Sequence, residues 1–250
     1  MLVQIDYELH FTAPFHLGTG IRAGLIDRTV MKDNGGYLYV PASTLKGVLR
    51  EYCERLLRFY LPDDQESVAS PHDAEAVLIE FGRAPTLISR IFGSQLHPGG
   101  LRFNDAKMER NPFYKEIQSS VSTQVRIDRI WRTAVDEALY TSEYGIRDLR
   151  FEGTIKGTLD CTPIASPRII GCSKESHMVK PTYSLLLLLS GLLMFEQIGG
   201  NKSTGKGQCQ CSITRLRLDK QPCSETTWQC WIDHLDVLSD YPTAEKGAQL

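Results

Sequence analysis

The sequence has few of the features that place a protein in a membrane or outside the cell. Its most apolar stretch, Leu185 to Phe195, is interrupted by Ser190 and Gly191 and falls short of the roughly 20 residues that span a bilayer. The first residues, MLVQIDYELHF, contain neither the basic flank nor the apolar block of a signal peptide. We therefore expect a cytoplasmic protein with no membrane partner.

The sequence also lacks any C-x-x-C pair, although it contains seven cysteines. An odd number of cysteines without a secretory signal disfavours a disulfide framework. The late cluster of Cys209, Cys211, Cys223, Cys230 and His234 matches no common zinc spacing. We expect buried free thiols at these positions.

Basic residues are missing from one segment and scarce in a second, and these two acidic segments hide a basic body. Residues 61–80 carry six acids and no Lys or Arg, and residues 219–246 carry six acids and two Lys. The net charge is −2, so without these two segments (−6 and −4) the rest of the chain stands at +8. A basic body suits a polyanionic partner, although solvated surface charge is an equally simple explanation.

Hydrophobic periodicity predicts the first half of the fold. Apolar residues alternate with polar ones from Val3 to Phe11, which indicates a half-buried strand. A Gly-rich stretch from Thr12 to Pro41 predicts loops with a short strand. Ser43 is then the expected N-cap of a helix that runs to Tyr60, before Pro62.

Three further strands and a second helix are expected after residue 100. The strands are predicted at 101–105, 151–159 and 208–218, with a bulge near Thr214, and the buried helix at 183–197, stopped by Gly199 and Gly200. Residues 107–150 are polar and irregular in pattern, which is typical of an insertion. Trp228, Trp231, Leu235 and Leu238 follow helical spacing and predict an amphipathic piece that docks on the body or a neighbour.

This order of elements predicts an α+β fold. Strand, helix, strand, strand, helix, strand is the ferredoxin-like, or RRM-like, split βαββαβ arrangement. We expect one domain over residues 1–218, with insertions at about 61–100 and 107–150 and an acidic C-terminal extension at 219–250. The fold alone does not give the function.

Two loops contain residues suited to phosphate. The first is the glycine-rich turn between the second helix and the last strand, in which backbone amides can approach a ligand closely; its candidate residues are Gly199, Gly200, Lys202, Ser203, Thr204, Gly205, Lys206 and Gly207. The second is the start of the first helix, with Ser43, Thr44, Lys46 and, four residues on from the lysine, Arg50. A flexible connector and an ordinary helix cap are the structural alternatives.

These loops belong to a series of ordered segments that resembles the RAMP superfamily of CRISPR–Cas systems, in particular the repeated backbone subunit of type III effector complexes. The segments are Phe15-His-Leu-Gly-Thr-Gly20, Gly24-Leu-Ile-Asp-Arg-Thr-Val30, Val40-Pro-Ala-Ser-Thr-Leu-Lys-Gly47, Ile91-Phe-Gly-Ser94, Gly100-Leu-Arg-Phe-Asn-Asp-Ala106, Val125-Arg-Ile-Asp-Arg129, Glu143, Phe151-Glu-Gly153 and the Gly199–Gly207 loop. The resemblance extends from residue 3 to about 218.

The resemblance implies that the chain binds guide CRISPR RNA and complementary target RNA, and assembles with copies of itself or with paralogous subunits. Guide phosphates would be held by the helix start and the glycine-rich loop. A protruding hairpin, the thumb, is expected within residues 121–150, where Arg126, Arg129 and Arg132 are basic and Trp131, Tyr140 and Tyr144 can stack on bases. The stretch Ile130 to Thr141 is longer and less glycine-rich than in the family.

The resemblance also implies a cleavage site. Asp27 stands at the position of the aspartate that carries target-RNA cleavage, and Asp33 at that of a second, usually non-catalytic acid. Asp27 would handle a proton or hold one divalent ion, Mg²⁺, while the ribose 2′-hydroxyl of the RNA attacks. Arg22 and Arg28 flank it and would bind target phosphate, or else be solvated charges.

Two other functions remain open from the sequence. One is a non-catalytic paralogous subunit of the same complexes. The other is a stand-alone guide-processing endoribonuclease, which commonly depends on a histidine in the N-terminal half; His10 and His16 keep this alternative open. The helix start at Ser43 and the stretch ending at Asp27 argue against it.

Overall fold

The structure is a computed structural model, and it describes residues 1–61, 85–160, 162–171 and 180–242. The acidic segment predicted as an insertion therefore lies almost wholly outside the described residues.

The strands are β1 (Leu2–Phe11), β2 (Tyr39–Val40), β3 (Leu101–Phe103), β4 (Ala106–Lys107), β5 (Ser119–Ile127), β6 (Ala134–Gly145), β7 (Arg150–Thr158), β8 (Cys209–Leu218) and β9 (Gln221–Cys223). The helices are α1 (Ala42–Tyr60), α3 (Leu87–Phe92), α4 (Pro112–Ile117), α5 (Pro167–Ile170), α6 (Tyr183–Leu193) and α7 (Glu225–Ile232), with 3-10 turns η1 (Lys202–Thr204) and η2 (Leu235–Asp240).

The body is built on one antiparallel sheet, which confirms the predicted α+β class. Its strand order is β2-β4-β7-β1-β8-β9, with β3 also paired to β7. The four central strands, β8-β1-β7-β3, are compatible with the predicted ferredoxin-like order. The bulge near Thr214 is also confirmed, because Asp6 pairs with Arg215 and Tyr7 with Ile213, so that Thr214 is left over.

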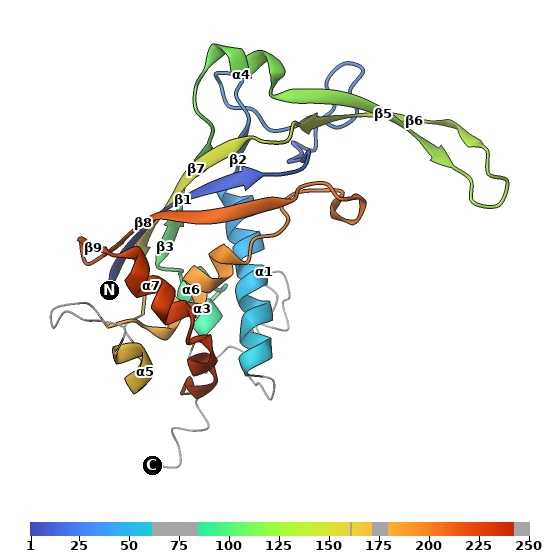
Figure 1. Cartoon of the computed structure of the whole chain (residues 1–250). Helices are drawn as coiled ribbons and strands as arrows, with labels where there is room; N and C mark the ends of the chain where they lie inside the picture. The colour runs from blue at the N-terminus through green and yellow to red at the C-terminus, as the bar shows by residue number, and fades with distance from the viewer. Residues whose placement is uncertain (62–84, 161, 172–179, 243–250) are drawn as a thin grey trace.

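The helices α1, α3, α6 and α7 lie on one side of this sheet (Figure 1). The alternating apolar side chains of β1 and one face of α1 are buried between the two layers; the buried residues of α1 are Leu45, Leu49, Tyr52, Cys53, Leu56 and Leu57. The small residue Gly191 allows the close approach of α6, because a Cβ there would meet Cys53 Sγ at 2.5 Å. The other face of the sheet is not covered by these helices.

Two predicted helix ends are wrong. Ser43 is not the N-cap of α1: Pro41 occupies that position, and the Asp105 carboxylate accepts from the Ala42 amide at 2.8 Å in place of a local cap. The helix α6 ends at Leu193, four residues before Gln197. The reason is that residues 196–198 pair with residues 207–209, which lead into β8. One of these hydrogen bonds runs from the Ile198 amide to the Gly207 carbonyl at 2.8 Å.

Residues 107–150 are regular in structure, which corrects the expectation of an irregular insertion. They hold β4, α4 and a long two-stranded hairpin of β5 and β6 that projects from the body (Figure 1). The tip is a tight turn in which the Asp128 carboxylate accepts from the amides of Ile130 and Trp131 at 2.7 and 2.9 Å. The predicted hairpin is therefore present; it spans residues 119–145 and so begins two residues before the predicted range of 121–150.

The segment after β8 packs on the body, as its apolar spacing predicts. Trp228, Trp231 and Leu238 are buried, and β9 extends the sheet beside β8. Cys53, Cys209 and Cys211 are buried free thiols and Cys223 is free, whereas Cys230 is disulfide-bonded, which corrects the expectation for that position. Within the described ranges, no helix is both long and apolar enough to cross a membrane.

Candidate nucleic-acid interface

The loop that follows β1 and the hairpin β5–β6 meet in an open pocket. It is lined by Arg22, Asp27, Arg28, Arg126 and the β6 residues Ala138, Leu139 and Tyr140. The first three residues come from the Gly-rich loop and the fourth from β5, almost 100 positions later in the chain. Four of the residues proposed from the sequence, including the catalytic candidate, are thus brought together in one place.

Asp27 is held against the hairpin by both its backbone and its side chain. Its amide donates to the Thr141 carbonyl at 2.9 Å, and its Oδ2 accepts from the Thr141 amide at 2.9 Å. Its Oδ1 lies 3.6 Å from Nε of Arg22, and the side chain is one-third exposed. The carboxylate is therefore fixed on one oxygen and accessible from the pocket on the other.

Arg28 is fixed by the same strand. Its backbone carbonyl accepts from the Glu143 amide at 2.8 Å, and its guanidinium lies 5.6 Å from the centre of the Tyr140 ring. With Arg22 and Arg126, three guanidinium groups face one carboxylate. The pocket has a net positive charge and planar donors of the kind that bind phosphate.

A divalent ion fits this pocket in one mode only. Among the described residues, no group of three or more His, Cys, Asp and Glu side chains could hold a metal ion without other ligands. Mg²⁺, however, is often bound through one or two protein carboxylates, with substrate phosphates and water completing its octahedron. Asp27 Oδ1 would supply one protein ligand of this kind, and it would share that oxygen with the Arg22 guanidinium, 3.6 Å away.

The glycine-rich loop forms a second candidate contact, on the other side of the hairpin base. Its ends are fixed to the segment after β1: the Gly200 amide donates to the His16 carbonyl at 2.9 Å, and the Gly207 amide donates to the Pro14 carbonyl at 2.8 Å. Gly207 has φ of +76°, and a Cβ there would lie 2.2 Å from the Ile198 carbonyl oxygen. Only glycine fits, which is a physical reason for this residue.

The exposed part of this loop lies between these fixed ends. Ser203 and Gly205 are exposed, Lys202 is half-buried, and Asn201 donates from Nδ2 to the Tyr144 hydroxyl at 3.0 Å. Lys206 lies over the Tyr144 ring, with Nζ 5.0 Å from its centre. The loop therefore presents a hydroxyl and two ammonium groups on a rigid support.

The candidate residues at the start of α1 differ in whether the fold already uses their side chains. Ser43 is exposed, and Thr44 and Lys46 are half-buried. The Arg50 guanidinium is instead committed within the fold, because it donates to Glu54 at 2.8 Å and to the Gly93 carbonyl at 3.3 Å. Contact of Arg50 with a ligand would first require these bonds to break, whereas the other three need no rearrangement.

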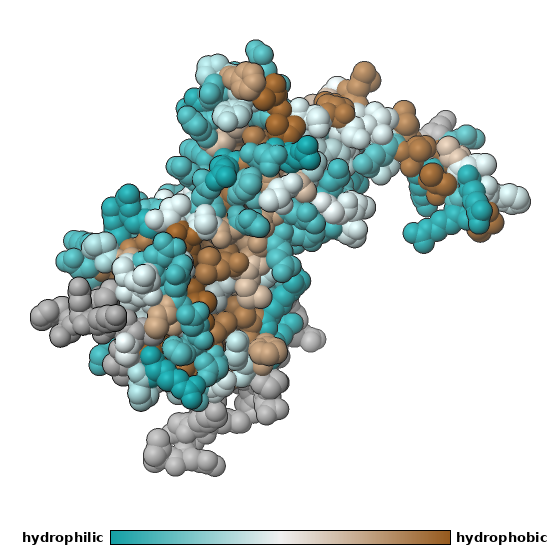
Figure 2. All heavy atoms as spheres, viewed as in Figure 1, coloured by the Kyte–Doolittle hydropathy of each residue, from teal (hydrophilic) through white to brown (hydrophobic). Residues whose placement is uncertain are grey.

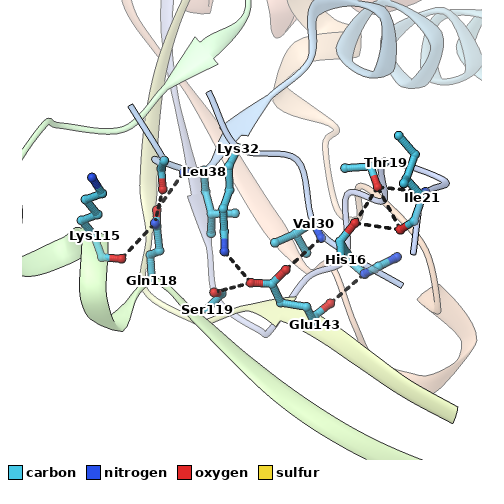
Figure 3. A network of polar contacts seen from close by, with 12 residues as sticks. His16, Thr19, Ile21, Val30, Lys32, Leu38, Lys115, Gln118, Ser119 and Glu143 are labelled. Carbon is cyan, nitrogen blue, oxygen red and sulfur yellow. Dashed lines mark hydrogen bonds and ion pairs between the residues drawn. The ribbon is translucent and has the colours of Figure 1, made fainter. Parts of the chain in front are cut away.

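A buried ionic network at the base of the hairpin was not predicted from the sequence (Figure 3). The side chain of Glu143 on β6 is only 8% exposed and accepts from Lys32 Nζ at 2.6 Å, Ser119 Oγ at 2.7 Å and the Val30 amide at 3.2 Å. Burial alone would raise the pKa of Glu143, but these donors outweigh it, and the pKa lies below its ordinary value. The loop that carries Asp27 is thereby tied to both strands of the hairpin.

The outer part of the hairpin has a different character. Its arm and tip expose apolar side chains (Figure 2): Val121, Val125, Ile127, Ile130, Trp131 and Leu139. Arg126 and Arg129 are exposed beside them, and Trp131 is 78% exposed. Tyr144, one of the predicted stacking residues, is instead buried at the base, where its hydroxyl accepts from Gln124 and Asn201.

Comparisons with known proteins identify the family and the fold. The family model described as the RAMP superfamily matches residues 8–210. The chain belongs to the RAMP superfamily. A chain in the cryo-EM structure of the Type III-B Cmr-beta bound to cognate target RNA has the same fold, with a TM-score of 0.53 and 13% sequence identity over 83% of this chain and 96% of that one. No curated protein matches the sequence significantly.

Proposed function

We propose that this RAMP protein is a subunit of a type III CRISPR effector complex that binds guide RNA and target RNA and cleaves the target beside Asp27. The observation that carries the proposal is the pocket between the first loop and the hairpin, where one carboxylate stands among three arginines. The solved structure with the same fold is bound to cognate target RNA, which supports an RNA ligand.

The guide strand is assigned to the glycine-rich loop and to the start of α1. Ser43, Thr44 and Lys46 offer hydroxyl and ammonium donors, and the loop offers those of Lys202, Ser203 and Lys206. Of the candidate glycines, Gly199 would offer its amide, whereas the amides of Gly200, Gly205 and Gly207 already donate to carbonyls of the fold, so these three glycines shape the loop. Replacing Lys46, Lys202 and Lys206 by Ala should lower the salt dependence of RNA binding by about two units, at ~0.7 per single-strand phosphate contact. An unchanged slope would remove this assignment.

The target strand is assigned to the pocket and the hairpin. Arg22, Arg28 and Arg126 would hold the phosphate that is cut, and Arg129 and Trp131 would contact the nucleotide displaced by the tip. With the phosphate held in line with the neighbouring ribose, the 2′-hydroxyl oxygen attacks the phosphorus and Asp27 Oδ1 accepts its proton. The bond from phosphorus to the 5′-oxygen breaks, which leaves a 2′,3′-cyclic phosphate and a 5′-hydroxyl that takes its proton from water. The guanidinium groups then stabilise the charge that develops on the phosphate.

Mg²⁺ is part of the proposal. If Asp27 Oδ1 holds the ion instead of taking the proton, Mg²⁺ would neutralise charge on the phosphate that the RNA brings, and a water molecule would take the proton. Removal of divalent ions with a chelator should abolish cleavage and leave guide binding within a few-fold. Cleavage at full rate in the chelator would exclude the ion.

The decisive experiment is a conservative change at the carboxylate. Asp27→Asn keeps an oxygen that can accept from the Thr141 amide, but removes the proton acceptor and the charge. In a complex assembled with guide RNA, we expect target cleavage to fall by about 100-fold or more, with guide and target affinity retained. Glu51→Ala on the exposed side of α1 is the control.

Two outcomes would redirect the proposal. If Asp27→Asn cuts the target at every position at the normal rate, this chain is a non-catalytic paralogous subunit. If the purified protein alone cuts unprocessed repeat RNA, it is a guide-processing enzyme. The second outcome is disfavoured by the placement of His16, whose Nδ1 donates to the Glu143 carbonyl at 2.8 Å and whose ring packs on Tyr144.

A further inference from the structure

The uncovered face of the main sheet carries a row of cations that none of the sites above uses. Arg102 on β3 is directly opposite Lys156 on β7, Lys156 is opposite Gln4 on β1, and Gln4 is opposite Arg217 on β8. The neighbouring residues Ile5, Ile155 and Leu216 are buried on the helix side. Since side chains alternate along a strand, all four row members point away from the helices.

These cations have no counter-ion within the described part of the chain. No ion pair there involves Arg102, Lys156 or Arg217, and Arg215, in the next row, has none either. The nearest acid in register is Asp6, which faces Arg215 and already accepts from Thr154 at 2.9 Å. The three cations of the row span about 14 Å across four strands.

The opposite end of the same face is neutralised. There, Arg150 donates to Glu8 at 2.6 Å, His10 lies 3.6 Å from Asp148, and Lys107 is opposite Glu152. The uncompensated charge is therefore confined to one end of the face and is not a general property of the sheet.

The face is suited to a nucleic-acid backbone and not to bases. In an RRM, aromatic side chains on the open sheet stack on bases. The outward positions of β1, β3, β7 and β8 carry no Phe, Tyr or Trp, since they are held by Leu2, Gln4, Asp6, Glu8, His10, Arg102, Arg150, Glu152, Thr154, Lys156, Thr158, Gln210, Ser212, Arg215 and Arg217. Tyr39 on β2 is outward, but it is opposite Lys107 at the neutralised end of the face. A line of guanidinium and ammonium groups without stacking partners matches a phosphate chain.

We propose that Arg102, Lys156 and Arg217 form a second, sequence-independent contact for the backbone of single-stranded RNA, on the open face of the sheet. The proposal rests on the RNA-binding function proposed above. The row lies seven residues along β1 from Phe11, where the candidate sites begin, which is about 23 Å. RNA that leaves those sites would reach the row by extending over this distance.

The test uses the triple variant Arg102→Gln, Lys156→Gln, Arg217→Gln and a single-stranded RNA of about 30 nucleotides. We expect about tenfold weaker binding and a salt slope smaller by about two units, equally for oligo(U) and oligo(A). The matched control is Arg55→Gln, Arg147→Gln, Arg168→Gln, which removes the same charge from other exposed positions. The control should bind like the wild type, because bulk charge is not the cause.

The outcomes separate the two proposals. If the wild type binds RNA and the row variant binds like the control, the row is not an RNA contact, and the function proposed above is unaffected. If the wild type binds no RNA, both proposals fail. If the row variant loses binding only to poly-glutamate, the row serves an acidic protein surface and the RNA proposal is overturned. Should the triple variant fail to fold, the single variants Arg102→Gln and Arg217→Gln provide the same test. Each is expected to bind RNA about two- to threefold more weakly than the wild type.

Discussion

The hairpin β5–β6 is built differently at its two ends. At the base, Glu143 and Tyr144 are buried and their polar groups are bonded to the first loop and the glycine-rich loop. At the tip, Ile130 and Trp131 are 84% and 78% exposed. The base therefore determines where the hairpin lies, and the tip is free to contact a ligand without loss of stability.

The same comparison explains why the catalytic candidate lies at the base. Asp27 is bonded to Thr141, only two residues from Glu143, so the carboxylate is rigid with respect to the hairpin. In the proposed function, RNA displaced by the hairpin would then meet a carboxylate at a fixed position. A site built farther out on the arm would lack this support.

The largest expected effect is at the base. Glu143→Ala removes the acceptor of Lys32, Ser119 and the Val30 amide, and should lower the free energy of unfolding by about 3 kcal/mol. Chemical denaturation measures this free energy. The control Ser119→Ala removes only one of the hydrogen bonds to Glu143 and should lower the free energy of unfolding by only about 1 kcal/mol. A loss below about 0.5 kcal/mol for Glu143→Ala would mean that the base is not held by this network.

A pair of glycine substitutions gives the next largest effect. Gly207→Ala should cost about 2 kcal/mol and weaken guide-RNA binding, because its Cβ would strike the Ile198 carbonyl. Gly205 has a similar φ of +77° but open space around it, so Gly205→Ala should cost about 1 kcal/mol. Thermal unfolding and RNA titration of both variants compare the fixed and the exposed part of the loop. Equal losses of stability and RNA binding in the two variants would contradict the predicted difference between the fixed and the exposed part of the loop.

Much of the body could be predicted from the sequence. The alternation in β1 and the change of phase at Thr214 are local signals, and both were confirmed. The base of the hairpin gave no such signal: Glu143 and Tyr144 lie in a polar run and are buried only because the first loop packs on them. Helix capping by Asp105 likewise depends on a residue 63 positions away, which local rules place on Ser43 instead.

The sequence suggested individual residues of the candidate site, but it did not show that they lie together. Asp27, Arg22 and Arg28 are close in sequence, whereas Arg126 joins them only through the pairing of Thr141 with Asp27. The commitment of Arg50 to Glu54 and Gly93 could not be predicted either, since one partner lies in a distant loop.

Acid should weaken the base before the tip. The pKa of Glu143 is below its ordinary value in the fold, and so is that of Asp33, which accepts from the amides of Tyr37 and Gly35 and from Arg110. Groups with lowered pKa stabilise the fold above their unfolded pKa of about 4, and this contribution is lost as the pH falls further. The free energy of unfolding should decline below about pH 5, less steeply in Glu143→Gln; an equally steep decline in that variant would contradict the assignment.

The smallest effect is expected at the tip. Trp131→Ala should change the free energy of unfolding by less than about 0.5 kcal/mol, because the side chain is exposed. A larger loss, measured by denaturation, would mean that the tip contributes to the folded body.

The central claim is that the base holds the hairpin and Asp27 in position and that the tip displaces a nucleotide of the target RNA. Shortening the tip tests this claim most directly. Residues 129–132 are replaced by Asn-Gly, which retains Thr141 and so the hydrogen bonds of Asp27. Guide-RNA affinity and single-turnover target cleavage are then measured on one preparation of the assembled complex. The account predicts guide affinity within a few-fold of the wild type and cleavage beside this subunit slower by about 100-fold, because the ribose hydroxyl is no longer aligned. Cleavage at the wild-type rate would contradict it.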